Sequence, residues 1–140
     1  MQTEPDHVLP EWAQNLTSAL DEKMGFQLGE LTAERVTGSM PVAGNTQPIG
    51  LWHGGASGVL IETLASMGSA VAGLPDRVGV GVDLNVTHLR PATSGRVHGV
   101  ATLLRKGHRT VCYEVRLTDD AGHDVAIGRL TCQLVRRPTH

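Results

Sequence analysis

The sequence predicts an α+β domain in which an antiparallel sheet wraps around one long central helix. A chain of 140 residues is long enough for one compact domain with its own core. Residues 56–74 form the longest apolar stretch, and its apolar positions recur at helical spacing. The segments after this stretch alternate apolar and polar residues, which is typical of strands. Because such a helix is apolar on most of its circumference, the sheet is expected to cover it.

The first part of the chain is expected to precede that domain. Apolar residues recur at helical spacing between Pro10 and Met24, and Gly25 follows as a stop signal, so a short helix is predicted here. We therefore expect residues 1–24 to form an N-terminal extension with a short helix and residues 25–137 to form the domain.

Two strands are predicted before the long helix. Residues 26–31 and 34–42 alternate loosely, as the strands of a hairpin do, and one face of the second carries Val36, Met40 and Val42. A loop rich in glycine, asparagine and proline then leads to the helix.

Four strands are predicted after the long helix, which ends at Gly73 and Pro75. The clearest strand signal in the chain is the strict alternation of Val78, Val80, Val82, Leu84 and Val86. The other three strands cover residues 96–104, 110–117 and 124–135. Because tight turns separate these three, they are expected to form an antiparallel meander.

Composition argues against several classes of protein. A net charge of −2 and an aromatic content of 3% are not those of a nucleic-acid binder. Cys112 and Cys132 lack a metal-binding spacing and are predicted to be reduced thiols. The polar segment 1–11 has no apolar stretch of a secretory signal, so the cytoplasm is the expected location.

Membrane and metal binding are also disfavoured. Residues 56–74 are long enough to suggest a membrane span, but they contain Glu62 and many small residues, so a buried central helix is the better interpretation. His88, His98 and His108 lack the short spacings of metal ligands. We therefore expect no metal and no cofactor.

Candidate functional residues lie around the start of the long helix. Gly54 and Gly55 come directly before it, where backbone N–H groups lack partners and the helix dipole adds partial positive charge. Such donors suit an anion or a developing oxyanion. Glu62 lies two turns further on, and Ser66 follows on the same face. A carboxylate on an otherwise apolar, buried helix is costly to ionise, which indicates a functional role.

Together with Gln47 and His53 upstream, these residues resemble the active-site signature of hotdog-fold acyl-CoA thioesterases. The resemblance rests on residues 47–55 (QPIGLWHGG) and continues through Glu62 to Ser66. It is strongest to the subgroup that places Glu, not Asp, on the central helix. That subgroup includes 1,4-dihydroxy-2-naphthoyl-CoA thioesterase of menaquinone biosynthesis, the enterobactin-pathway proofreading thioesterase and one type of 4-hydroxybenzoyl-CoA thioesterase.

The resemblance implies a catalytic role for each of these residues. Gly54 would donate its backbone N–H to the thioester oxygen, and Gln47 and His53 would orient or polarise that carbonyl. Glu62 would act as nucleophile or as general base for water, and Ser66 would position the water or the carboxylate. In related enzymes the Gly and the Glu of one site come from different subunits. A homodimer or homotetramer with its active site at the subunit interface is therefore implied.

Coenzyme A carries phosphates, so cations are expected at the mouth of the site. Arg90 ends the strongest strand and matches a family position near the nucleotide. Lys106, His108 and Arg109 lie at a turn that could lie beside Arg90, where phosphate contacts would be charge-assisted. The alternative is a solvated basic turn without a ligand.

The expected reaction is hydrolysis of an aromatic acyl-CoA, such as 1,4-dihydroxy-2-naphthoyl-CoA or a hydroxybenzoyl-CoA, to the free acid and CoA. Medium-chain aliphatic acyl-CoA and a non-catalytic acyl-CoA-binding module are the alternatives. A hotdog dehydratase or hydratase is disfavoured, because those enzymes arrange a His and an Asp or Glu differently. A Ser-His-Asp triad is not expected either, because Ser57 lies within the helix start and no G-x-S-x-G motif is present.

Overall fold

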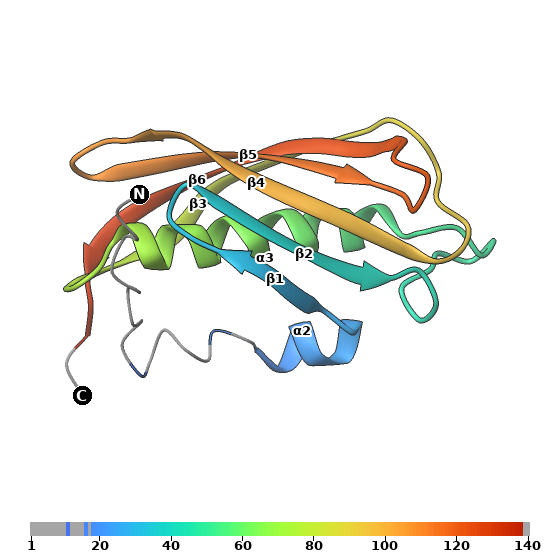
Figure 1. Cartoon of the computed structure of the whole chain (residues 1–140), viewed down its shortest axis with the longest axis horizontal. Coiled ribbons are helices and arrows are strands. Elements are labelled where there is room, and N and C mark those ends of the chain that lie inside the picture. Colours follow the sequence, from blue (N-terminus) through green and yellow to red (C-terminus); the bar gives the residue numbers. More distant parts are fainter. Residues whose placement is uncertain (1–10, 12–15, 17, 139–140) are drawn as a thin grey trace, which may run out of the picture.

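The computed structural model describes residues 11, 16 and 18–138. Its elements, in chain order, are α2 (Ala19–Met24), β1 (Gln27–Leu31), β2 (Arg35–Pro41), α3 (Gly54–Ala72), β3 (Arg77–His88), β4 (Arg96–Lys106), β5 (Thr110–Thr118) and β6 (Asp124–Arg136). Figure 1 shows α3 running along one face of the sheet, so the predicted α+β arrangement is confirmed.

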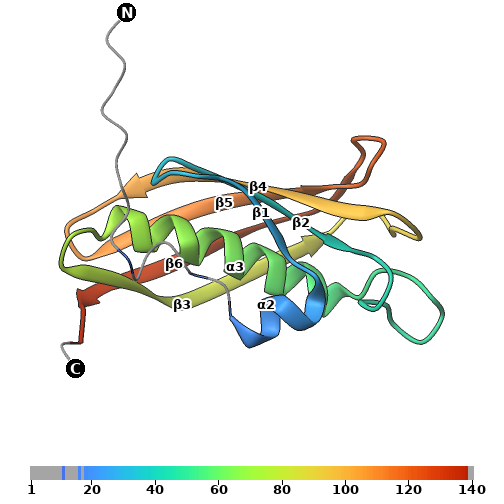
Figure 2. The same cartoon turned by 60° about the horizontal axis from the view of Figure 1, so that its bottom comes forward.

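The strands form one antiparallel sheet in the order β1-β2-β4-β5-β6-β3. Strands β4, β5 and β6 follow one another across it, as the predicted meander requires. The chain leaves β2, passes through α3 and returns as β3 at the far edge, so the sheet curves around the helix (Figure 2). Strands β1 and β3 are the two edges of the sheet.

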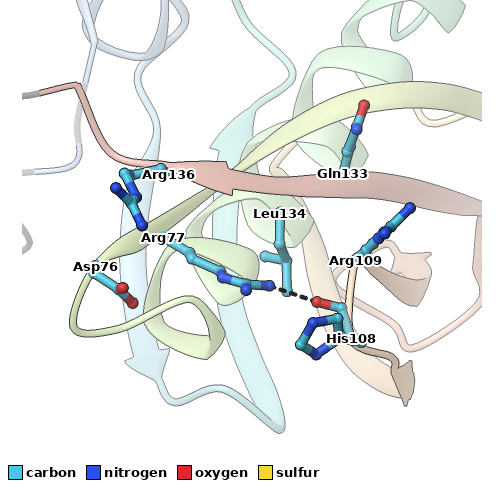
Figure 3. Close-up of a pocket in the computed structure, with 7 residues that line it drawn as sticks. All are labelled: Asp76, Arg77, His108, Arg109, Gln133, Leu134 and Arg136. Carbon is cyan, nitrogen blue, oxygen red and sulfur yellow. Dashed lines mark hydrogen bonds between the residues drawn. The ribbon is translucent and has the colours of Figure 1, made fainter.

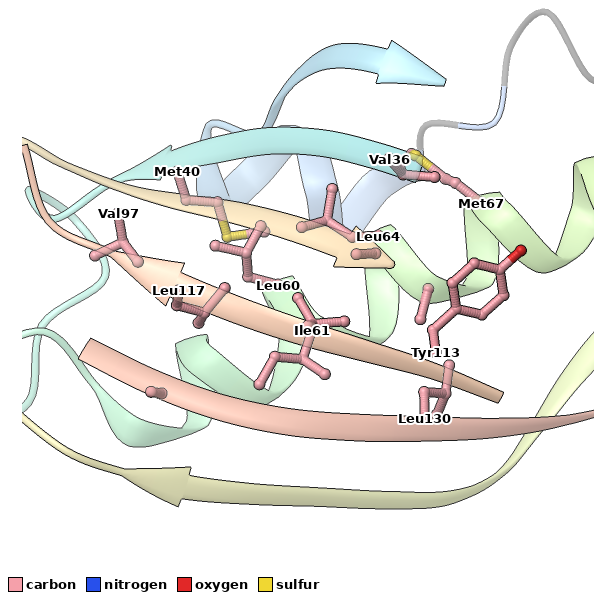
Figure 4. Packing of buried hydrophobic residues seen from close by; sticks show 14 of the residues in the cluster. Val36, Met40, Leu60, Ile61, Leu64, Met67, Val97, Tyr113, Leu117 and Leu130 are labelled. Carbon is pink, nitrogen blue, oxygen red and sulfur yellow. The ribbon is translucent and has the colours of Figure 1, made fainter. Parts of the chain in front are cut away.

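The core lies between α3 and the inner face of the sheet (Figure 4). Leu60, Ile61 and Leu64 of α3 are fully buried there. Gly68 allows the ring of Tyr113 to lie directly against the helix, because a Cβ at Gly68 would be 2.8 Å from two ring carbons. The Tyr113 hydroxyl donates to the carbonyl of Ala33 at 2.5 Å, and burial raises the pKa of this phenol above its usual range.

Helix α3 is long and apolar enough to cross a membrane, judged by length and composition alone. Within this fold, however, 61% of its most apolar window is buried by the rest of the chain. The apolar character of the helix is therefore explained by its place in the core, as the sequence predicted.

The starts of both predicted helices differ from the structure, whereas the predicted strand ends lie within two residues of the observed ones. A single helix was expected from Pro10 to Met24, and in the structure α2 covers Ala19–Met24, because Ser18 has extended backbone angles and caps its start. The predicted positions 10, 12–15 and 17 lie outside the described residues. The long helix begins at Gly54 and not after Gly55, so both glycines belong to its first turn.

Candidate active site

The start of α3 offers one unused backbone donor. His53 is the N-cap residue, and its Nδ1 accepts the N–H of Gly55 at 2.8 Å. The carbonyl of His53 accepts the N–H groups of Ala56 and Ser57. Among the described residues, the Gly54 N–H has no acceptor, so it is free to bind a ligand oxygen.

The side chain of Gln47 is held by its own loop. Its Oε1 accepts the N–H of Ile49 at 2.6 Å and that of Leu51 at 3.3 Å. Both bonds use the oxygen, and the amide nitrogen Nε2 donates to no acceptor among the described residues, so its two hydrogens are available. Gln47 is therefore presented as a donor, which suits a carbonyl oxygen.

Gln47 and Gly54 line one cavity of about 430 Å³, together with His88 and Arg90 at the end of β3. A Cβ added at Gly54 would be 2.9 Å from Cε1 and 3.0 Å from Nε2 of His88, so the imidazole lies directly over the helix start. His53 is exposed and does not line this cavity. The structure thus brings together Gln47, Gly54 and Arg90 and adds His88, for which the sequence predicted no role at this site.

Glu62 lies in a different cavity, of about 310 Å³, and Ser66 lines it as well. The expectation that Glu62 is buried is wrong for a single chain, since its side chain is exposed. The reason is its position on the face of α3 toward the edge strand β3. A Cβ added at Gly81 of β3 would lie 2.9 Å from Glu62 Oε1, so this glycine leaves the space that the carboxylate occupies.

The two cavities share no lining residue. Gly54 and Glu62 are eight residues apart on α3, which corresponds to about 12 Å along the helix axis. Within one chain, the donors and the carboxylate therefore belong to separate half-sites: one with Gln47 and Gly54, the other with Glu62 and Ser66.

Ser57 has a structural role. It is fully buried, and its Oγ accepts the indole N–H of Trp52 at 2.7 Å. Cys132 is also buried, and burial raises the pKa of its thiol, which disfavours the thiolate needed for nucleophilic attack. Cys112 and Cys132 are both free, as predicted. No cluster of three or more His, Cys, Asp or Glu in the described part of the chain is placed to hold a metal.

The predicted basic turn does not lie beside Arg90 within one chain. His108 and Arg109 line a cavity of about 460 Å³ with Arg77 and Arg136 (Figure 3). Lys106 and His108 line a neighbouring cavity with Ala72 and Gly73, at the C-terminal end of α3. Arg90 lies near the N-terminal end, and the helix between them is about 28 Å long. The topology separates them, because β3 starts beside the end of α3 and finishes beside its start.

Comparison with known proteins agrees with this architecture. Residues 49–126 match the family model of the Thioesterase superfamily. The chain is 35% identical over 122 residues to the proofreading thioesterase EntH of Cronobacter turicensis, covering 85% of this chain and 89% of EntH.

Solved structures give the same result. A crystal structure of a mutant of thioesterase PA1618 from Pseudomonas aeruginosa superposes with a TM-score of 0.80 at 38% identity, covering 84% of this chain and 86% of that one. Thioesterase HI1161 from Haemophilus influenzae gives a TM-score of 0.85 at 26% identity, covering 92% and 91%. The chain therefore belongs to the Thioesterase superfamily and is a thioester hydrolase of the hotdog fold.

Proposed function

We propose that the protein hydrolyses an aromatic acyl-CoA thioester at a site built by two subunits. The observation that carries this proposal is the division of the site within one chain. One cavity has oxyanion donors and no carboxylate among its lining residues, and the other has the carboxylate without those donors. A complete site needs one half from each of two copies.

The edge strand β3 supports pairing with a second copy. It spans Arg77–His88, and Val80, Val82 and Leu84 are 50%, 59% and 38% exposed. A long edge strand with exposed apolar side chains and unpaired backbone groups is a template for another strand. Because a two-fold axis pairs identical strands antiparallel, β3 of one chain is proposed to pair with β3 of the next.

The positions of Gly81 and His88 define the proposed register. Glu62 lies against Gly81, and Gly54 lies against His88. If Gly81 pairs beside His88 of the partner subunit, Glu62 faces the Gly54 half-site of that subunit. The same antiparallel arrangement brings the Arg77 end of one strand to the Arg90 end of the other. Lys106, His108 and Arg109 would then join Arg90 of the partner subunit around the phosphates of CoA.

The chemistry follows from the two half-sites. The thioester oxygen accepts hydrogen bonds from the Gly54 N–H and from Gln47 Nε2, which stabilise the negative charge of the tetrahedral intermediate. Glu62 of the other chain either removes a proton from water, so that hydroxide attacks the carbonyl, or attacks the carbonyl itself to form an anhydride that water hydrolyses. Ser66 lies in the same cavity as Glu62, where it orients the water or the carboxylate. In both routes the C–S bond breaks, and the CoA thiolate leaves and takes up a proton.

The cavity beside Glu62 is proposed to hold the acyl group. Small residues, Ala70 and Gly79, line it between α3 and β3 together with the flexible Met67. The small side chain of Ala70 leaves room on the helix side for a planar ring, which favours an aromatic acyl group over an aliphatic chain. Its volume of about 310 Å³ is at the small end of the range for ligand cavities.

Release of free thiol from benzoyl-CoA, compared with octanoyl-CoA, tests the proposal. The wild type is expected to release CoA, with a higher kcat/KM for the aromatic thioester, and Glu62→Ala is expected to lose turnover. Binding of acyl-CoA without thiol release would contradict the proposal in favour of a binding module. Equal turnover by the wild type and Glu62→Ala would remove Glu62 from the mechanism.

A further inference from the structure

Asn45 lies at the base of the loop that carries Gln47, and the proposed reaction does not use it. It is 9% exposed, although asparagine is usually an exposed residue. Residues 45–53 form a short hairpin, here called the Gln47 hairpin, and its base is closed by the N–H of His53, which donates to the carbonyl of Asn45 at 2.9 Å. One arm of the hairpin carries Gln47, and the other arm leads directly into Gly54.

The side chain of Asn45 joins the Gln47 hairpin to two other parts of the chain. Its Nδ2 donates to the carbonyl of Pro41, at the end of β2, and to the carbonyl of Met24, at the end of α2, both at 2.8 Å. An amide nitrogen has two hydrogens, so both are used by these bonds. Because Asn45 is buried and its acceptors lie outside the hairpin, these two bonds fix the hairpin relative to the sheet.

Gln47 does not anchor its own arm of the hairpin. Its hydrogen bonds to other described residues all stay within the hairpin. Among the described residues 45–49, Asn45 has the only side chain that hydrogen-bonds outside the hairpin. The other arm has a separate anchor, since the N–H of Trp52 donates to the carbonyl of Ala92 at 2.8 Å. The place of Gln47 therefore depends on Asn45.

We propose that Asn45 is a positioning residue for the oxyanion donors, because its side-chain amide sets where Gln47 Nε2 and the Gly54 N–H lie. This inference rests on the proposed function and adds to it a residue that does not line the donor cavity. Misplacing a reacting group by about 1 Å costs roughly 100-fold in rate. Loss of the two Asn45 bonds lets the hairpin shift, so the rate falls although both donors are still present.

The first test compares Asn45→Ala with a variant that loses a buried hydrogen bond elsewhere. Asn45→Ala is expected to lower kcat for benzoyl-CoA by about 10- to 100-fold in the thiol-release assay. Tyr113→Phe is the matched control, since it removes the bond to the Ala33 carbonyl and lines neither half-site. It is expected to lower the melting temperature and leave kcat unchanged. Wild-type kcat in Asn45→Ala, or an equal loss in both variants, would overturn the inference.

Mixed dimers show which half of the site Asn45 serves. When Glu62→Ala and Gln47→Glu chains are combined, the complete site of a mixed dimer takes its donors from the Glu62→Ala chain and its carboxylate from the Gln47→Glu chain. Asn45→Ala is expected to lower the recovered thiol release by about 10-fold or more when it is added to the Glu62→Ala chain. Added to the Gln47→Glu chain, it should leave the recovered release unchanged, because the complete site does not use the donors of that chain.

The opposite dependence would overturn the inference. The alternative is that Asn45 acts through Met24 and α2, which lines the Glu62 cavity, and release would then fall only with Asn45→Ala in the Gln47→Glu chain. An equal loss in both placements would show a general loss of structure and also overturn it. The thioesterase assignment stands in both cases. If Asn45→Ala does not fold, Asn45→Asp, which keeps the size of the side chain but cannot donate when ionised, replaces it in both mixtures.

Failure of the proposed function gives different results. If the mixture of Glu62→Ala and Gln47→Glu chains recovers no thiol release, the shared site is wrong, and the comparison of Asn45→Ala with Tyr113→Phe still decides the role of Asn45. If the wild type releases no thiol from benzoyl-CoA, the proposed function fails together with the inference.

Discussion

The contact between Gly81 and Glu62 gives a sharp prediction for Gly81→Ala. The added Cβ would lie 2.9 Å from Glu62 Oε1 and 3.4 Å from Leu130 Cδ1. Carbon and oxygen atoms normally approach to about 3.3–3.6 Å, so the carboxylate must move by about 0.5 Å. The contact with Leu130 needs little adjustment, so Glu62 takes up most of the change.

A displacement of this size affects the rate more than the fold. Because misplacing a reacting group by about 1 Å costs roughly 100-fold, kcat of Gly81→Ala is expected to fall by about 10-fold or more. KM is expected to change little, since the oxyanion donors and the cation cluster are unaffected. The assay is thiol release under saturating acyl-CoA, with the melting temperature measured on the same preparation.

A double-mutant cycle shows whether the effect acts through Glu62. In a Glu62→Ala background there is no carboxylate to displace, so adding Gly81→Ala is expected to leave the residual rate unchanged. Wild-type kcat in Gly81→Ala would show that this contact does not position Glu62. A loss of rate by the same factor with and without Glu62 would show that the alanine acts through another part of the structure.

Four further predictions test other parts of the structure. Gln47→Glu keeps the oxygen that its loop binds but replaces the donor, so kcat should fall about 100- to 1,000-fold at an unchanged melting temperature. Val82→Lys places a charge on the β3 edge and should yield monomers with little activity, measured by light scattering and thiol release. Ser57→Ala leaves the buried indole N–H of Trp52 without its acceptor, so the free energy of unfolding, measured by denaturant titration, should fall by about 1–3 kcal/mol. Its kcat should not show the large loss that removal of a nucleophile would cause. A hydrogen bond with His98 lowers the pKa of the Asp120 carboxyl below its usual value. Ionised Asp120 therefore stabilises the folded state at pH values above the unfolded-state pKa. This stabilisation is lost as the pH falls through the folded-state pKa. Asp120→Asn should therefore show a smaller loss of melting temperature than the wild type when the pH falls below about 4.

Periodicity was sufficient to predict the central helix and the meander, because α3 and β4–β6 each bury one face against the other. It did not predict how β3 is oriented. Gly79 and Gly81 face α3, and a bulge between Gly81 and Asp83 then shifts the alternation, so that Leu84, Val86 and His88 face it instead. Apolar residues at every second position therefore lie partly on the outer face, where Val80 and Val82 are exposed.

The same bulge explains why His88 was missed as a neighbour of Gly54. The face of β3 on which the His88 side chain lies depends on this local bulge, and no pattern of residues in the strand predicts the bulge. The separation of Arg90 from the basic turn was missed for a different reason. Both segments flank strands, but only the topology shows that they lie at opposite ends of α3. By contrast, Gly54 and Glu62 could be singled out from the sequence, because a helix start has free backbone N–H groups and a carboxylate on an apolar helix is unusual, while their proposed roles came from the resemblance to hotdog thioesterases.

Mixing two inactive variants tests the shared site most directly. Glu62→Ala lacks the carboxylate and Gln47→Glu lacks the donor, so each homodimer should be inactive. In a mixed dimer, one site combines the intact Glu62 of one chain with the intact Gln47 of the other. Random mixing makes half of the dimers mixed, and each has one intact site of two, so about a quarter of wild-type thiol release should return. No recovery in a mixture shown to contain mixed dimers would mean that each site lies within a single chain, contrary to this account.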